Sequence, residues 1–183
     1  VRFTKRFDVS ASGGVRLCHN SCDLGGVLLK DWLVRVKDFL DENPDNVVQL
    51  LVQDDASVDD TEAAFVAAGL RDELFEYDGV SFPTLGDLID SKTRVFMTAE
   101  AAAETRPWFL SMFALYSDTP FAQTSLEALQ DPSSCDLNRG AVDDPLFLVN
   151  HFLGPVPAED KADEANVAAV LDDRVRRCAD ARG

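Results

Sequence analysis

The run Val47-Val48-Gln49-Leu50-Leu51-Val52, followed by Gln53-Asp54-Asp55, decides the predicted fold. A nearly continuous apolar segment of this length is typical of a parallel strand that is buried on both faces and ends in a polar loop. The segments Val95-Phe96-Met97 and Leu146-Phe147-Leu148-Val149 repeat the pattern. Strands of this kind, alternating with helices, predict an α/β fold with a parallel sheet, either an open doubly wound sheet or a closed (β/α) barrel.

Predicted helices separate these strands. One helix carries its apolar residues at the spacing of a single helix face, at Leu29, Trp32, Leu33, Val36 and Leu40. Asn43-Pro44 ends that helix, and Thr84 is a candidate N-cap for a short later one. We expect the remaining helices at residues 59–68, 85–89, 108–115, 125–129 and 159–179.

Polar residues follow the predicted strands where each strand ends. A strand over residues 1–9 places Arg6 and Asp8 on its polar face, and a strand over residues 15–18 leads to His19. The other strand ends carry Asp54, Thr98 and the pair Asn150-His151. Because α/β proteins build their sites at the carboxyl ends of parallel strands, we expect these side chains to share one edge.

His19 and Asp8 form the candidate acid–base pair. A histidine transfers protons near neutral pH, and a carboxylate hydrogen-bonded to its second ring nitrogen fixes the tautomer and raises the basicity. The alternative for His19 is a packed histidine beside a small disulfide loop. His151 also has two possible roles. It contacts the substrate, or it hydrogen-bonds the backbone at a strand end.

The composition predicts one soluble globular unit over residues 1–183. Hydrophobic residues make up 46% of the chain, and no apolar stretch approaches the roughly 20 residues that cross a bilayer. The net charge of −16 opposes nucleic-acid binding, because no basic stripe is present to neutralise a phosphate backbone. It also disfavours adsorption to anionic headgroups, so transient contact with a membrane surface requires a local apolar or basic patch.

The four cysteines favour disulfides over a zinc site, because they lack the usual CxxC spacing. We predict the pairs Cys18–Cys22 and Cys135–Cys178, among the three connectivities that four cysteines allow. Disulfides indicate an oxidising environment, so we expect a secreted protein.

No cofactor is predicted, since neither a GxGxxG nor a Walker-type glycine loop is present. Asp54 and Asp55 could hold a metal beside Asp8, but acidic pairs after strands are usually solvated. We therefore predict no metal site, and no clear motif supports a divalent cation such as Ca²⁺.

Five segments are distinctive in their order and spacing: LCHNSC (17–22), VKDFLDENP (36–44), VVQLLV (47–52), FPTLGDLI (82–89) and LFLVNHFL (146–153). In this order they resemble the phosphatidylinositol-specific phospholipase C X-domain-like phosphodiesterases, particularly the secreted microbial and fungal type. The segments span most of the chain. The resemblance implies an incomplete TIM-type (β/α) barrel with parallel strands, whose first and last strand elements we expect to lie outside residues 1–183.

The resemblance also implies a site in which two histidines cleave a phosphodiester. One histidine deprotonates the attacking hydroxyl, and the other, which His19 matches, protonates the leaving group. Asp8 matches the strand carboxylate of that site. The first histidine has no counterpart here and would lie upstream of Val1. Bacterial relatives often carry an arginine two residues after the strand aspartate, where it stabilises the phosphate charge. This chain has Ser10 at that position, and Arg6, on the same strand face as Asp8, is the candidate substitute.

Three functions remain as hypotheses. The first is a phosphoric diester hydrolase for an inositol phospholipid or a related phosphodiester, nearly inert without the missing histidine. Its expected substrate contacts are Arg6, Asp54, Asn150 and His151. The second is a non-catalytic barrel relative that binds a ligand or partner. The third is a structural or interaction fragment of a larger protein.

Overall fold

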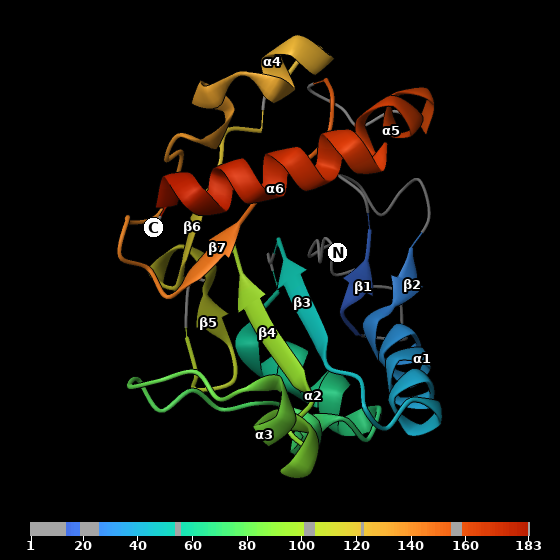
Figure 1. The fold of residues 1–183 in the computed structure, drawn as a ribbon. Coiled ribbons are helices and arrows are strands. Elements are labelled where there is room, and N and C mark those ends of the chain that lie inside the picture. The colour runs from blue at the N-terminus through green and yellow to red at the C-terminus, as the bar shows by residue number, and fades with distance from the viewer. Residues whose placement is uncertain are drawn as a thin grey trace. The chain divides into compact units, whose positions relative to one another are not determined.

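The computed structural model describes residues 14–18, 26–53, 56–100, 105–121, 123–154 and 159–182. The chain divides into two compact units, Val1–Met112 and Phe113–Gly183. Each unit combines helices with short strands, which confirms the predicted mixed α/β class (Figure 1).

The first unit contains a three-stranded parallel sheet. Its strands are β3 (Val48–Val52), β4 (Val95–Ala99) and β5 (Leu110–Ser111), with β4 in the centre. Figure 1 shows β3 and β4 side by side and pointing the same way. Every residue of β4 is buried, as expected for a central parallel strand. The predicted strand pattern is therefore confirmed for these segments.

The predicted amphipathic helix is α1 (Leu29–Glu42). Its apolar face packs into one hydrophobic core with β3, β4 and α2 (Val58–Ala67). Full burial of one such leucine side chain contributes about 1.5–3 kcal/mol. Before α1, β1 (Arg16–Leu17) and β2 (Val27–Leu28) pair antiparallel, so the expected parallel arrangement does not extend to them.

Thr84 caps α3 (Leu85–Asp90), as predicted. Thr84 Oγ1 accepts a hydrogen bond from the Asp87 N–H at 3.2 Å, and the Asp87 carboxylate accepts one from the Thr84 N–H at 3.0 Å. The side-chain and backbone hydrogen bonds from Thr84 lower the pKa of the Asp87 carboxyl below its usual value. This reciprocal pair satisfies backbone donors that the first helical turn leaves without partners. A short 3-10 helix, η2 (Arg71–Glu73), precedes α3 in the chain.

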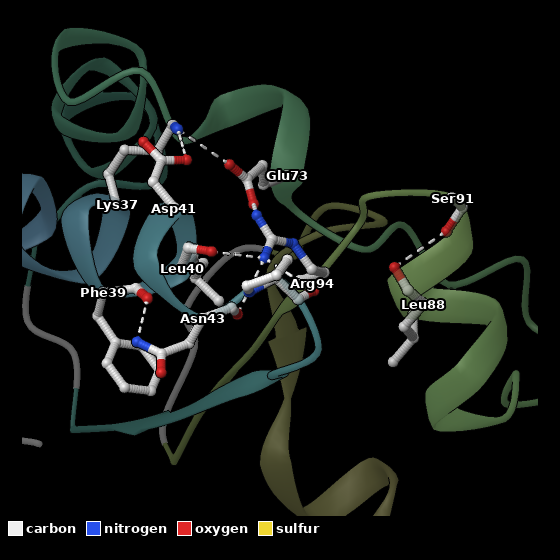
Figure 2. Close-up of polar contacts among 10 residues, drawn as sticks. Lys37, Phe39, Leu40, Asp41, Asn43, Glu73, Leu88, Ser91 and Arg94 are labelled. Carbon is white, nitrogen blue, oxygen red and sulfur yellow. Dashed lines mark hydrogen bonds and ion pairs between the residues drawn. The ribbon is translucent and has the colours of Figure 1, made fainter.

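Arg94 joins the amino-terminal end of β4 to the end of α1. Its Nη1 donates to the carbonyl oxygens of Leu40 at 2.8 Å and Pro44 at 3.2 Å, and its Nη2 pairs with Glu73 Oε2 at 2.8 Å. Figure 2 shows Lys37 reaching the same Glu73 carboxylate, at 3.5 Å. This network lies at the amino ends of the strands, where α/β folds place stabilising contacts, so we assign it to stability.

The second unit is built on two parallel strands and a long helix. β6 (Tyr116–Asp118) pairs with β7 (Leu146–Leu148), and the helix is α6 (Ala168–Arg182). The shorter helices are α4 (Leu126–Gln130), η4 (Pro132–Cys135) and α5 (Glu159–Ala165). None of the helices in the described ranges combines the length and apolar character needed to cross a membrane.

A disulfide joins Cys135 of η4 to Cys178 of α6, with their Cα atoms 4.9 Å apart. This is one of the two predicted pairs. The other prediction, Cys18 with Cys22, includes a residue outside the described ranges.

The helix predicted at residues 108–115 is wrong. The chain instead forms β5 and a 3-10 turn, η3 (Met112–Ala114). Arg106 and Phe109 exchange both backbone hydrogen bonds, at 3.0 and 2.9 Å, around a tight turn whose second residue is Pro107. Proline favours that turn position. Trp108 and Phe109 are both buried, so their apolar character reflects the core and not a helix face.

The single helix predicted at residues 159–179 is also wrong, because α5 and α6 are separate. The break lies at Asn166 and Val167. The Ala165 carbonyl oxygen lies 2.8 Å from His151 Nε2, so a side chain takes the acceptor that a continuous helix would use for its next turn.

Candidate functional site

Polar side chains gather at the carboxyl ends of β6 and β7. Asp118 is the last residue of β6, Thr119 follows it, and Asn150 lies two residues beyond β7. Asn150 Nδ2 donates to Asp118 Oδ2 at 3.1 Å and to the Thr119 carbonyl oxygen at 2.7 Å. The Asn150 backbone N–H donates to Thr119 Oγ1 at 2.9 Å. Three hydrogen bonds from one residue therefore connect the two strand ends.

Asp118 is a fully buried carboxylate surrounded by N–H donors. Its Oδ1 accepts from Asn138 Nδ2 at 3.1 Å and from the Arg139 backbone N–H at 2.9 Å. Its Oδ2 accepts from Arg139 Nε at 3.0 Å, from Arg139 Nη2 and from Asn150 Nδ2. A carboxylate offers about four lone-pair sites, so these donors occupy its acceptor capacity. Asp118 is thus suited to organise its neighbours.

Arg139 is held by this ion pair and by two aromatic rings. Its guanidinium carbon lies 4.3 Å from the centre of the Phe113 ring and 5.0 Å from that of Phe121. The next residue, Gly140, has φ +79°, and a Cβ there would collide with the Tyr116 carbonyl oxygen. Glycine adopts this conformation without steric cost. The close approach at Gly140 therefore places Arg139 beside the end of β6.

The two faces of the β6–β7 pair carry different side chains. One face contacts arginines of α6, through Ser117, Thr119, Phe147 and His151. Because side chains alternate along a strand, Tyr116 and Asp118 lie on the other face. Asn150 reaches Asp118 there. Burial raises the pKa of the Tyr116 phenol above its usual value.

His151 lies on the α6 side. Its Nε2 is 2.8 Å from the Ala165 carbonyl oxygen, and its Nδ1 is 3.4 Å from Arg174 Nη1. A carbonyl oxygen only accepts and a guanidinium only donates, so the contacts select the neutral tautomer with the proton on Nε2. They match the backbone-bonding alternative, and a substrate contact by His151 stays a prediction.

The carboxyl ends of β3 and β4, in the first unit, carry a separate polar set. Gln53 follows β3 and Glu100 follows β4, and Gln53 Nε2 donates to Glu100 Oε2. Thr98 is fully buried, and its Oγ1 has no hydrogen-bond partner in the described part of the chain. Within those same ranges, no group of three or more His, Cys, Asp or Glu side chains is arranged to hold a metal ion.

Comparison with known proteins places this chain among relatives. The family model described as PI-PLC X 1 matches residues 1–183. The chain belongs to the PI-PLC X family. PI-PLC X domain-containing protein 1 of Arthroderma benhamiae is 33% identical over 156 residues, which cover 77% of this chain and 49% of that protein. A protein of the same organism named "Uncharacterized secreted protein" is 33% identical over 155 residues, covering 78% of this chain and 35% of the relative.

The PI-PLC X chain thus spans about half the length of the first relative and about a third of the second. No solved structure matches it. The family predicted from the five sequence segments is confirmed by the family model and by the named relative.

The site predicted for this PI-PLC X chain lies partly outside the described residues. Those outside are Arg6, Asp8, His19 and Asp54, whose roles stay predictions. Asn150 and His151 are described, and although they are adjacent in sequence, their side chains contact opposite faces of the strand pair. Asn150 is therefore the predicted substrate contact that joins the buried network at this edge of the PI-PLC X chain.

Sequence reasoning missed the partners of Asn150. Asp118 follows the short segment Tyr116-Ser117, and the rule that polar residues follow apolar strands would have found it if so short a strand had been recognised. Arg139 and Arg174 come from distant positions, and no local spacing connects them to β6.

Proposed function

We propose that the protein is a phosphoric diester hydrolase of the phosphatidylinositol-specific phospholipase C type, built on a (β/α) barrel. Membership of the PI-PLC X family and parallel strands with polar carboxyl ends support this proposal. The observation that carries it is that the buried carboxylate of Asp118, paired with the half-buried Arg139, holds Asn150 at such an edge. The proposed substrate is an inositol phospholipid or a related phosphodiester.

The proposed reaction needs a base, an acid and groups that hold the substrate. A general base takes the proton from the attacking hydroxyl. That oxygen bonds to phosphorus, the bond to the leaving oxygen breaks, and His19 gives its proton to the leaving oxygen. Asp8 orients His19, Arg6 faces the phosphate charge, and Asp54 contacts the headgroup.

Asn150 has a defined part in this proposal. Both N–H groups of its side-chain amide donate within the protein, to Asp118 Oδ2 and to the Thr119 carbonyl oxygen. As far as the described residues go, the amide oxygen is the atom left to accept a hydrogen bond from a substrate hydroxyl. A headgroup with several hydroxyls, such as inositol, offers such a donor.

The proposed setting is extracellular. A disulfide within the second unit supports it, because such bonds persist in oxidising compartments, and a relative carries the name of a secreted protein. The net charge of −16 argues against strong attraction to anionic lipid, so contact with the membrane surface is brief.

The test is the release of phosphorylated inositol from phosphatidylinositol vesicles by the full-length protein. We expect His19→Ala to lower the rate by about 10²–10⁴-fold, as removal of a general acid does. Asn150→Leu should raise KM, whereas the matched control Asn166→Leu, at an exposed position, should not. Equal rates for the wild type and His19→Ala would remove His19 from the mechanism.

A second candidate function is a binding module that lacks catalysis. The observation that favours it is that Asp118 and the His151 ring are both occupied by contacts within the protein. Saturable binding of inositol 1-phosphate to a full-length protein that releases no product from vesicles would support this alternative and exclude the hydrolase.

A further inference from the structure

Arg174 is a fully buried arginine in the middle of α6. Burial lowers the pKa of its guanidinium to about 10, and the nearby charge of Arg177 acts in the same direction. The side chain therefore remains a cation at neutral pH. Burying a cation is costly unless it is paired or fully hydrogen-bonded, so its partners indicate what it does.

The partners of Arg174 are neutral acceptors from three elements. Nη1 donates to the Asn150 carbonyl oxygen and lies 3.4 Å from His151 Nδ1. Nη2 donates to the Ser134 carbonyl oxygen at 3.0 Å and lies 3.5 Å from Thr119 Oγ1, and Nε lies 3.4 Å from Ser134 Oγ. Among the described residues, no carboxylate pairs with this guanidinium. It therefore connects the ends of β6 and β7 to η4 instead of balancing a charge.

Asn150 is fixed by this arrangement through its own backbone. Its carbonyl oxygen accepts from Arg174, and its N–H donates to Thr119 Oγ1, which Arg174 also approaches. Both polar backbone groups are thus held on the α6 side, while the side-chain amide reaches Asp118 on the opposite face. The position of the amide oxygen consequently depends on contacts made behind the strand pair.

We infer that Arg174 is a positioning residue, which sets the Asn150 amide for a substrate hydroxyl from the helix side of the strands. This inference rests on the proposed role of Asn150 in substrate contact. His151 belongs to the same support, because its Nδ1 faces Arg174 and its Nε2 faces Ala165 of α5. His151 thus contributes to the contacts behind the strand pair.

The disulfide holds together the two elements, η4 and α6, that carry Arg174 and its partner Ser134. Cys135 follows Ser134, an Arg174 partner, and Cys178 lies one helical turn after Arg174. The covalent bond keeps η4 against α6 close to the point where the Arg174 guanidinium contacts Ser134 and Asn150.

The experiment compares two matched pairs of variants in the full-length protein. Arg174→Met removes the guanidinium, and Arg176→Met is its control at an exposed position of the same helix. Thr119→Val removes the hydroxyl that accepts from the Asn150 N–H, and Thr119→Ser restores it. If Arg174→Met does not fold, Thr119→Val and Thr119→Ser still test whether contacts on the helix side position Asn150.

Two measurements are made on each variant. The first is KM and kcat on phosphatidylinositol vesicles, where we expect Arg174→Met and Thr119→Val to raise KM about tenfold, the effect of one lost hydrogen bond, with kcat little changed. The second is the NMR signal of the Asn150 side-chain amide, assigned with ¹⁵N-asparagine and Asn150→Leu. It should shift in those two variants and stay in place in Arg176→Met and Thr119→Ser.

The outcomes separate this inference from the proposed function. An unmoved Asn150 amide signal in folded Arg174→Met and Thr119→Val overturns the positioning role, whatever the activity. A shifted signal with unchanged KM in an active enzyme also overturns it. A wild-type protein that releases no product refutes the proposed hydrolase and with it the role in substrate contact, while a shifted amide signal would still establish that Arg174 positions Asn150.

Discussion

Replacing Asp118 by Asn removes the charge of the buried carboxylate and keeps its shape. If the new amide oxygen occupies the place of Oδ1, the hydrogen bonds from Asn138 and the Arg139 backbone survive. The new NH₂ group then faces three donors, Arg139 Nε, Arg139 Nη2 and Asn150 Nδ2. Removing one partner of a buried ion pair costs about 3–5 kcal/mol. Because Arg139 is 32% exposed, we expect the lower end, about 3 kcal/mol.

Urea unfolding followed by far-UV circular dichroism measures this loss, since both tryptophans lie in the first unit and would not report on the second. Asp143→Asn, at an exposed position, is the matched control. A double-mutant cycle with Arg139→Met should give a coupling energy above about 1 kcal/mol. A loss for Asp118→Asn no larger than that of Asp143→Asn would refute the view that this carboxylate organises the strand ends.

Three further predictions concern stability. Tyr116→Phe should leave the unfolding free energy unchanged or raise it slightly, because the buried hydroxyl has no partner among the described residues. Burial raises the pKa of the Tyr116 phenol, so above about pH 10 the tyrosine ionises more readily in the unfolded state and the wild type loses stability. Tyr116→Phe should therefore lose less unfolding free energy than the wild type when urea unfolding is repeated at alkaline pH. Glu73→Gln should lower the unfolding free energy by about 2 kcal/mol, because it leaves Arg94 buried without its carboxylate partner. Thermal unfolding measures this loss, and a much smaller one would contradict the assigned role of the ion pair. Replacing Cys135 and Cys178 by Ser should cost about 4 kcal/mol for a separation of 43 residues, and an unchanged urea midpoint would contradict this.

The sequence predicted the elements whose evidence is local. The apolar spacing of α1 and the capping position of Thr84 each lie within a few residues, and the structure confirms both. The continuous apolar runs that became β3 and β4 are likewise local signals. The Cys135–Cys178 bond was the exception among long-range contacts, because few connectivities were available.

The two wrong helix predictions, at residues 108–115 and 159–179, have a physical cause in tertiary contacts. Trp108 matches a helix face in sequence, but Pro107 turns the chain and the core buries the ring. The break between α5 and α6 depends on His151, which binds the Ala165 carbonyl oxygen from 14 positions away. No periodicity within the helix contains that information.

The candidate site shows the same limit. Asn150 was predicted from its place after an apolar run, a local feature. The residues that hold it are separated from it by tens of positions, and Arg174 lies in a helix whose sequence reads as an ordinary amphipathic segment. Burial of a cation among neutral acceptors becomes visible only when the strand ends and the helix are placed together.

Gly140 limits how the loop between β6 and β7 can be redesigned. A side chain there would press on Ser117 Cα, 2.8 Å from the added carbon, and would lift the segment away from the strand. Earlier in the same loop, Ser134 accepts a hydrogen bond from Arg174 and Cys135 is bonded to Cys178 of α6. A replacement loop between these strands therefore has to keep three fixed points, Ser134, Cys135 and the glycine at position 140.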